Sequence, residues 1–201
     1  MDTARVEALL ARERRVILGI TGPPGAGKTR LAREVASSFD EAVHIPMDGF
    51  HLADAELRRL GRLERKGAID TFDAYGFLAL IERIRRRPKH PIYAPAFDRD
   101  IEQPVAGSIL VPPETRLVVT EGNYLLDDDP PWPAIAARLD EVWYVDVARE
   151  ERRRRLVARH VEFGKTPQQA DAWVRDVDEP NAARIEEGRT HADLVVPSPR
   201  E

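Results

Sequence analysis

The stretch Gly22-Pro23-Pro24-Gly25-Ala26-Gly27-Lys28-Thr29 decides the fold of this chain. It matches the pattern G-x-x-x-x-G-K-[ST], in which a glycine-rich backbone wraps a polyphosphate with its N–H groups pointing inward. We expect Lys28 to reach the β- and γ-phosphates and the Thr29 hydroxyl to ligand Mg²⁺. The octapeptide therefore predicts a loop that binds a nucleoside triphosphate.

The flanking segments have the secondary structure that such a loop needs. Residues 16–20 form a short apolar run, typical of a buried strand. Residues 29–36 carry Leu31 and Val35 four positions apart, as on one face of a helix. Strand, loop and helix thus follow in the required order, and the helix N-terminus would add partial positive charge at the phosphates.

The rest of the chain alternates between predicted strands and helices. Further strands are expected at 42–47, 116–120, 141–147 and 192–196. Helices are expected from the N-terminus to about residue 14, in the first half of 53–66, and at 74–87, 148–163, from 167 and at 180–187, with Asp73 and Thr166 as N-caps. The proline-rich segment 91–113 should be irregular or a small hairpin. This alternation predicts an α/β three-layer sandwich with a central parallel five-stranded sheet.

Length and composition fit one globular domain over 1–201, with 42% hydrophobic and 33% charged residues. The formal net charge of −4 gives no reason to expect nucleic-acid binding. The chain has no cysteine, which excludes disulfides and thiolate chemistry. We find no apolar run long enough to span a membrane and no secretory signal pattern at the N-terminus, so we expect a cytoplasmic protein.

Two acidic residues follow predicted strands, where the ligand crevice of a parallel sheet lies. Glu121 would reach the Mg²⁺ shell near Thr29, or it is a solvent-facing acid at a strand end. Asp48 precedes Gly49 after the second strand. A carboxylate there could align and deprotonate a hydroxyl nucleophile, although an Asp-Gly pair after a strand is often only a turn.

The predicted helix 148–163 carries an arginine-rich face. Arg152, Arg155 and Arg159 are spaced to share one side, opposite Leu156 and Val161. Such a face is either solvated or closes over the phosphates and stabilises developing charge. Arg155 and Arg159 are the stronger candidates for the second role.

A substrate region is expected between 48 and 113. Of the five histidines, none has metal-ligand spacing and only His51 lies near Asp48. Tyr93, Asp98, Arg99 and Glu102 form a polar set that suits a hydroxylated substrate, or else a surface loop.

Over about 15–196 the chain resembles the phosphate-loop kinases of the uridine kinase, phosphoribulokinase and type I pantothenate kinase group. The matching stretches are Gly22 to Thr29, Asp48-Gly49-Phe50-His51, Thr71-Phe72-Asp73, Tyr93 to Arg99, Glu121-Gly122-Asn123-Tyr124-Leu125-Leu126, and Asp146 through Arg159-His160. Uridine kinases usually have Asp-Ser-Phe-Tyr at the second of these, and Asp at position 160. The chain looks most like the short bacterial nucleoside- or sugar-kinase-like members.

The resemblance implies ATP and Mg²⁺ as cofactors and assigns roles to residues. Asp48 would be the catalytic base, and Thr29 and Glu121 would serve the metal. Arg155 and Arg159 would belong to a small helical lid over 148–178. Acceptor selection would fall to residues of the matching stretches, namely His51, Phe72, Tyr93, Asp98 and Arg99. The group also allows a homodimer.

We therefore expect an ATP-dependent kinase that transfers the γ-phosphate to a hydroxyl of a small metabolite, such as a nucleoside, a sugar or a pantothenate-like compound, with neither nucleic acid nor membrane as partner. A non-kinase P-loop NTPase or regulatory switch is the alternative, although no Asn-Lys-x-Asp guanine-reading motif is present. Within the enzymes, a nucleoside monophosphate kinase is a closer alternative, because Arg99 could hold an acceptor phosphate.

Overall fold

The computed structural model describes residues 3–12 and 14–199. Its centre is a sheet of five parallel strands in the order β2-β5-β1-β6-β7. The strands are β1 (Val16–Thr21), β2 (Ala42–Pro46), β5 (Leu117–Glu121), β6 (Glu141–Asp146) and β7 (Leu194–Pro197). The predicted parallel five-stranded sheet is confirmed.

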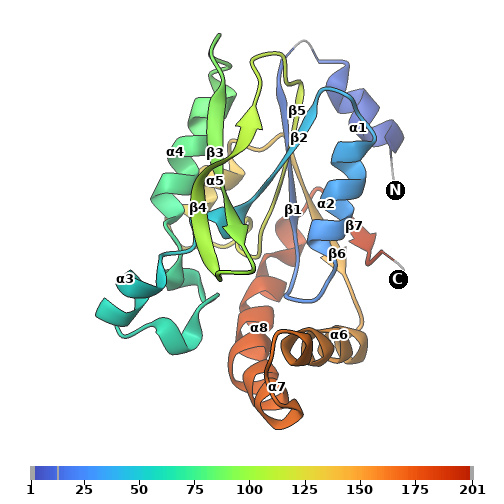
Figure 1. Cartoon of the computed structure of the whole chain (residues 1–201). Helices are drawn as coiled ribbons and strands as arrows, with labels where there is room; N and C mark the ends of the chain where they lie inside the picture. The colour runs from blue at the N-terminus through green and yellow to red at the C-terminus, as the bar shows by residue number, and fades with distance from the viewer. Residues whose placement is uncertain (1–2, 13, 200–201) are drawn as a thin grey trace.

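Helices cover both faces of this sheet, as Figure 1 shows. Helices α1 (Thr3–Leu10) and α2 (Lys28–Ser37) pack on one face, in a buried cluster that includes Leu18 and Ile20 of β1. Helices α4 (Ala74–Arg85) and α5 (Trp132–Ala136) pack on the other face, where Ile17 of β1 points. Because side chains alternate along a strand, one apolar run supplies both cores. The three-layer sandwich is confirmed.

A helical lid lies beyond the carboxyl ends of the strands, at the bottom of Figure 1. It consists of α6 (Arg149–Glu162), α7 (Pro167–Trp173), the π-helix η4 (Val174–Asp178) and α8 (Glu179–Glu187). Thr166 and Gln169 form a capping box at the start of α7. The predicted starts of these helices are therefore close to the observed ones.

The proline-rich segment folds as the hairpin that the sequence allowed. Strands β3 (Ile92–Asp98) and β4 (Gln103–Val111) pair antiparallel, with a register shift between Ala94 and Ala96. The hairpin packs against the turn η1 (Met47–Phe50), which follows β2. Between that turn and α4 lie α3 (Asp54–Arg59) and the short turns η2 (Leu63–Arg65) and η3 (Ile69–Thr71), and the turn η5 (Gly188–His191) precedes β7.

Two helix predictions differ from the structure. Helix α1 ends at Leu10 and not near residue 14, because the described residues that follow, Ala11, Arg12, Arg14 and Arg15, have no large apolar side chain to pack on the sheet. Helix α5 was not predicted, since Pro130, Pro131 and Pro133 obscure its apolar pattern. Proline is tolerated in the first turn of a helix, and Trp132 and Ile135 anchor this short helix in the core.

None of the helices within the described ranges has the length and apolar character needed to cross a bilayer.

Candidate active site

The phosphate loop joins β1 to α2 and has the backbone that its glycines make available. Gly25 and Gly27 have φ values of +80° and +90°, in the left-handed region that side chains disfavour. A Cβ atom on Gly25 would also lie 2.9 Å from Cγ of Leu156 in the lid helix. The loop therefore requires glycine both for its conformation and for its contact with α6.

Lys28, the first residue of α2, is almost fully buried, with 8% of its surface exposed. Its Nζ donates to the carbonyl of Pro23 across 3.0 Å, so the lysine spans the loop. Burial lowers the pKa of Lys28 to about 8, although the carboxylates of Glu121 and Asp48 oppose this effect. A buried ammonium inside a glycine loop fits the polyphosphate that the sequence predicts.

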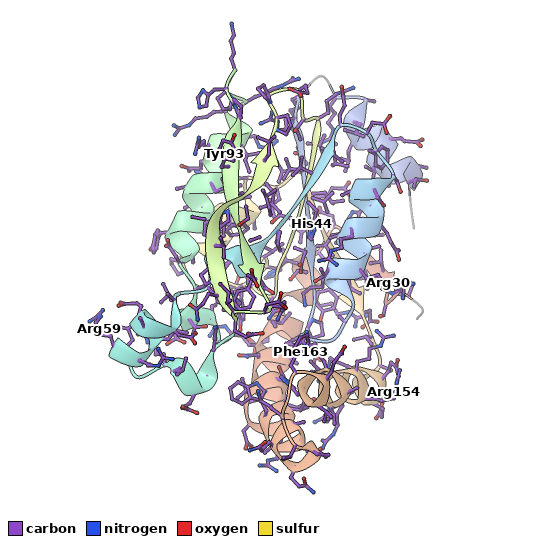
Figure 2. The ribbon with its side chains drawn as sticks, in the orientation of Figure 1. Arg30, His44, Arg59, Tyr93, Arg154 and Phe163 are labelled. Atoms are coloured by element: carbon purple, nitrogen blue, oxygen red, sulfur yellow. The ribbon has the colours of Figure 1, made fainter. Side chains whose placement is uncertain are left out.

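Thr29 and Glu121 meet at the end of the sheet. The Thr29 hydroxyl donates to Oε1 of Glu121 across 2.9 Å, and the parallel register places Glu121 beside Ile20, just before the loop. His44 of β2, labelled in Figure 2, has its Nε2 3.8 Å from the same oxygen. In the described part of the chain no three acidic or histidine side chains form a metal cage. Mg²⁺ at phosphoryl-transfer sites needs only one or two side-chain oxygens beside the phosphates, and this pair fits that requirement.

Asp48 lies in η1, and its side chain lines the same pocket as the loop, a cavity of about 810 Å³. Arg99, from the turn after β3, donates to Oδ2 of Asp48 across 2.9 Å. The next residue, Gly49, packs so closely under the hairpin that a Cβ atom would lie 2.4 Å from the carbonyl oxygen of Pro95. This contact fixes the position of Asp48 relative to the hairpin.

An aromatic wall stands next to Asp48. The His51 ring lies between the rings of Phe72 and Phe97, with centroid distances of 4.1 and 4.9 Å. Its Nδ1 is 2.8 Å from the carbonyl oxygen of Asp48, so this nitrogen carries the proton and donates. Burial lowers the pKa of His51, which keeps the ring neutral at pH 7. The wall can pack against the carbon skeleton of a small molecule.

The lid contributes two arginines to the pocket, Arg155 and Arg159. Arg155 donates from Nη1 to the hydroxyl of Ser198 across 2.6 Å, and Ser198 donates to the carbonyl of Ala26 in the loop across 2.8 Å. The side chain of Arg159 forms no ion pair or hydrogen bond with the other residues of 3–12 and 14–199. Phe163, the residue that caps the C-terminus of α6, also lines the pocket and is labelled in Figure 2.

Arg152 does not share the exposed face that its spacing suggested. It is 2% exposed, and its Nη2 donates to Glu179 of α8 across 2.7 Å. It therefore packs on the buried side with Leu156, while Val161, predicted on that side, is 38% exposed. The prediction for this face is wrong at both residues, because α8 supplies a carboxylate that lets the guanidinium be buried.

Two of the predicted acceptor residues do not reach the pocket. Tyr93 is 59% exposed. It lies near the start of β3, and Figure 2 shows it far from the lid. Asp98 accepts hydrogen bonds from the backbone N–H groups of Asp100 and Ile101 in the hairpin turn. Asp146, another strand-end acid, pairs with Arg189 across 3.0 Å. The structure thus brings together Asp48, His51, Phe72, Arg99 and Glu102 from the predicted substrate region. Tyr93, Asp98 and Asp146 do not line the pocket.

The pocket residues that the sequence analysis missed include Lys66, Phe97 and Lys165. The chain has only four lysines, and three of them, Lys28, Lys66 and Lys165, line this one pocket. Where arginine supplies almost all of the positive charge, the rarity of lysine was a usable signal. Phe97 carried no such signal, because only the hairpin fold turns it toward His51.

No protein-family model matches the chain. A protein of Schizosaccharomyces pombe named as a candidate uridine kinase is 34% identical, over 96% of this chain and 87% of its own length. An ATP-dependent kinase-like protein of Aspergillus versicolor is 39% identical, over 75% of this chain and 93% of its own. A crystal structure from Silicibacter sp. TM1040, described as a candidate fructose transport system kinase, is 34% identical with a TM-score of 0.88, covering 96% of this chain and 98% of that one.

Proposed function

The chain belongs to the P-loop kinases of the uridine kinase and phosphoribulokinase-like group, and from this premise we propose that it transfers the γ-phosphate of ATP to a hydroxyl of a small metabolite. Sugars, nucleosides and pantothenate-like compounds are the acceptor classes that this proposal covers. The observation that carries it is the position of Asp48. This carboxylate faces the same pocket as Lys28 and the Thr29–Glu121 pair, although the chain supplies them from three separate strand ends.

The proposed reaction follows from these positions. The acceptor hydroxyl oxygen attacks the γ-phosphorus, the bond from that phosphorus to the bridging oxygen breaks, and ADP leaves. The hydroxyl proton passes to the carboxylate of Asp48 as the new oxygen–phosphorus bond forms. Lys28 holds the phosphates, and Arg155 and Arg159 add positive charge from the lid side. Thr29 and Glu121 would hold Mg²⁺, which neutralises phosphate charge when bound.

The test is ADP release from ATP and Mg²⁺, with and without a panel of nucleosides, sugars, pantothenate, glycerate and nucleoside monophosphates. We expect one acceptor class to raise the rate and Asp48→Asn to abolish that rise while ATP still binds. Asp40→Asn, an exposed residue far from the pocket, is the matched control. Brisk ADP release that ignores every acceptor would instead support a non-kinase NTPase. Transfer to a phosphate group that survives Asp48→Asn would support a nucleoside monophosphate kinase.

A further inference from the structure

The acceptor side of the pocket holds two cations that the triphosphate does not need. Lys66 follows η2, and Arg99 lies in the turn after β3. The Lys66 Nζ and the Arg99 Cζ are each 5.1 Å from the centre of the Phe97 ring. Both cations therefore contact the Phe97 ring, in the corner of the pocket that contains Asp48.

Lys66 has donor capacity left in this corner. Its Nζ donates to Oδ1 of Asp54 across 2.6 Å and to the carbonyl of Glu102 across 2.5 Å. An ammonium group has three N–H donors, so a third remains for a ligand. The two partners also hold the lysine in place, since its side chain is only 15% exposed. Lys66 is thus a fixed cation, and not a mobile surface lysine.

Arg99 differs from Lys66, because its partner is the proposed base itself. It donates to Oδ2 of Asp48 across 2.9 Å, and its side chain is 50% exposed. Ion pairs with this exposure contribute little to stability and exchange partners readily. A hydroxyl that approaches Asp48 must compete with the guanidinium for that oxygen. An anion on the acceptor would offer Arg99 a second partner and remove the competition.

The acids at the rim do not cancel these cations. Asp100 and Glu102 also line this side of the pocket, but both are exposed to solvent, where water screens their charge. Closer to Phe97, Asp54 pairs with Lys66 and Asp48 pairs with Arg99. The capacity for an anion in this corner is therefore the third donor of Lys66 and the guanidinium of Arg99 once it leaves Asp48. A neutral polyol would leave the third donor of Lys66 without a charged partner, whereas a carboxylate or phosphate would satisfy it.

We propose that the acceptor is an acidic hydroxy compound whose carboxylate or phosphate is bound by Lys66 and Arg99, and that this binding draws Arg99 away from Asp48. The inference rests on the proposed function and narrows its substrate class. It also gives Arg99 a second effect, since the base is released only when an acidic acceptor is present. Carboxylate and phosphate share this chemistry, and the experiment separates them.

The experiment measures binding of matched probes to the full chain, loaded with a non-hydrolysable ATP analogue and Mg²⁺. The probe sets are glycerol, glycerate and glycerol 3-phosphate, then pantothenol and pantothenate, then a nucleoside and its 5′-monophosphate. We expect the acidic member of at least one set to bind at least about tenfold more tightly than its neutral partner, as one charge-assisted contact allows. The glycerol set shows whether carboxylate or phosphate is preferred. Equal binding, or no binding, of acidic and neutral members in every set would overturn the proposal.

Variants test the residues. Arg99→Gln should remove most of the acidic preference, because it weakens binding of the acidic probe and does not weaken binding of the neutral one, whereas Arg99→Lys should restore part of the preference. Arg83→Gln, an exposed arginine of α4 outside the pocket, is the matched control. A preference that survives Arg99→Gln would also overturn the proposal. Arg99 is half exposed, so this variant should fold, whereas Lys66→Gln breaks two contacts and serves as a secondary test.

The release of Asp48 has its own measurement. Without acceptor, Arg99→Gln should raise slow ATP hydrolysis up to about fivefold, the scale of an exposed ion pair, because Asp48 then becomes available to water. An unchanged rate would contradict the release step. Failure of the proposed function looks different, since no acceptor would then be phosphorylated even if the acidic probes bind more tightly.

Discussion

The hydroxyl of Thr29 and the carboxylate of Glu121 lie 2.9 Å apart, although 92 positions separate them in the chain. Strand β5 pairs with β1 in parallel register, which sets Glu121 level with Ile20 and so just before the loop. The carboxylate is 5% exposed and reaches a hydroxyl at the start of α2. A hydroxyl and a carboxylate held in this way are ligands that suit Mg²⁺ at bound phosphates.

This pair predicts how the magnesium dependence changes. Thr29→Val and Glu121→Gln should each lower the transfer rate by about a hundredfold or more, since a metal ion supplies several kcal/mol of charge stabilisation. Both should also raise the Mg²⁺ concentration needed for half-maximal rate, measured by magnesium titration at saturating ATP. Glu41→Gln, an exposed residue outside the pocket, is the control. An unchanged magnesium requirement in both variants would remove the pair from the metal site.

The lowered pKa of Lys28 predicts proton uptake on ATP binding. In the protein without ATP, burial lowers the pKa of Lys28 to about 8. Bound phosphates must raise this pKa, because negative charge favours the ammonium form. ATP should therefore bind with uptake of protons at pH 8.5, and its affinity should fall as pH rises through 8. Calorimetry in buffers of different ionisation enthalpy measures the uptake. Lys28→Met should abolish it, and an uptake that persists in this variant would point to another group.

The lid arginines predict a rate effect without a large stability effect. Arg159 lines the pocket and forms no ion pair in the part of the chain that the structure describes, so Arg159→Gln should lower the transfer rate about a hundredfold. Arg153, on the same helix, pairs with Asp171 on the outer surface, and Arg153→Gln should change the rate less than about threefold. Steady-state kinetics measure the transfer rates of the two variants. Equal rates for Arg159→Gln and Arg153→Gln would mean that the charge of Arg159 has no role in transfer.

The close contact of Gly49 predicts a cost for any side chain there. Its φ value is not positive, so the need for glycine comes from space alone. Gly49→Ala places a methyl group against the Pro95 carbonyl and should destabilise the fold by about 1–3 kcal/mol. It should also reduce transfer, because Asp48 is the adjacent residue. Denaturant unfolding measures the first effect, and unfolding at the parental midpoint would show that the hairpin moves aside at no cost.

Much of the site could be predicted from local patterns. The loop, the strand ends at Asp48 and Glu121, and the cap at Asp73 depend on neighbours within a few positions. The structure places these groups where the patterns suggested, with Asp73 accepting from the N–H of Gly76. Their catalytic and metal-binding roles stay predictions. Two arginines of α6 show where prediction from local patterns fails. The spacing predicted Arg152 and Arg155 on one face, but Arg155 lines the pocket and Arg152 does not, because Glu179 of α8 pairs with Arg152.

The sequence by itself determined the class of fold, because the spacing of apolar residues and the positions of glycines set the local strands, helices and loop. Only the tertiary structure decided the acceptor side. Side chains alternate along β3, so Tyr93 points outward while its neighbour Ala94 is buried, and the register shift after Ala94 changes the pairing before Phe97. Lys66 reaches the same corner from another segment. Contacts between distant segments depend on how the elements pack, and no local period contains that information.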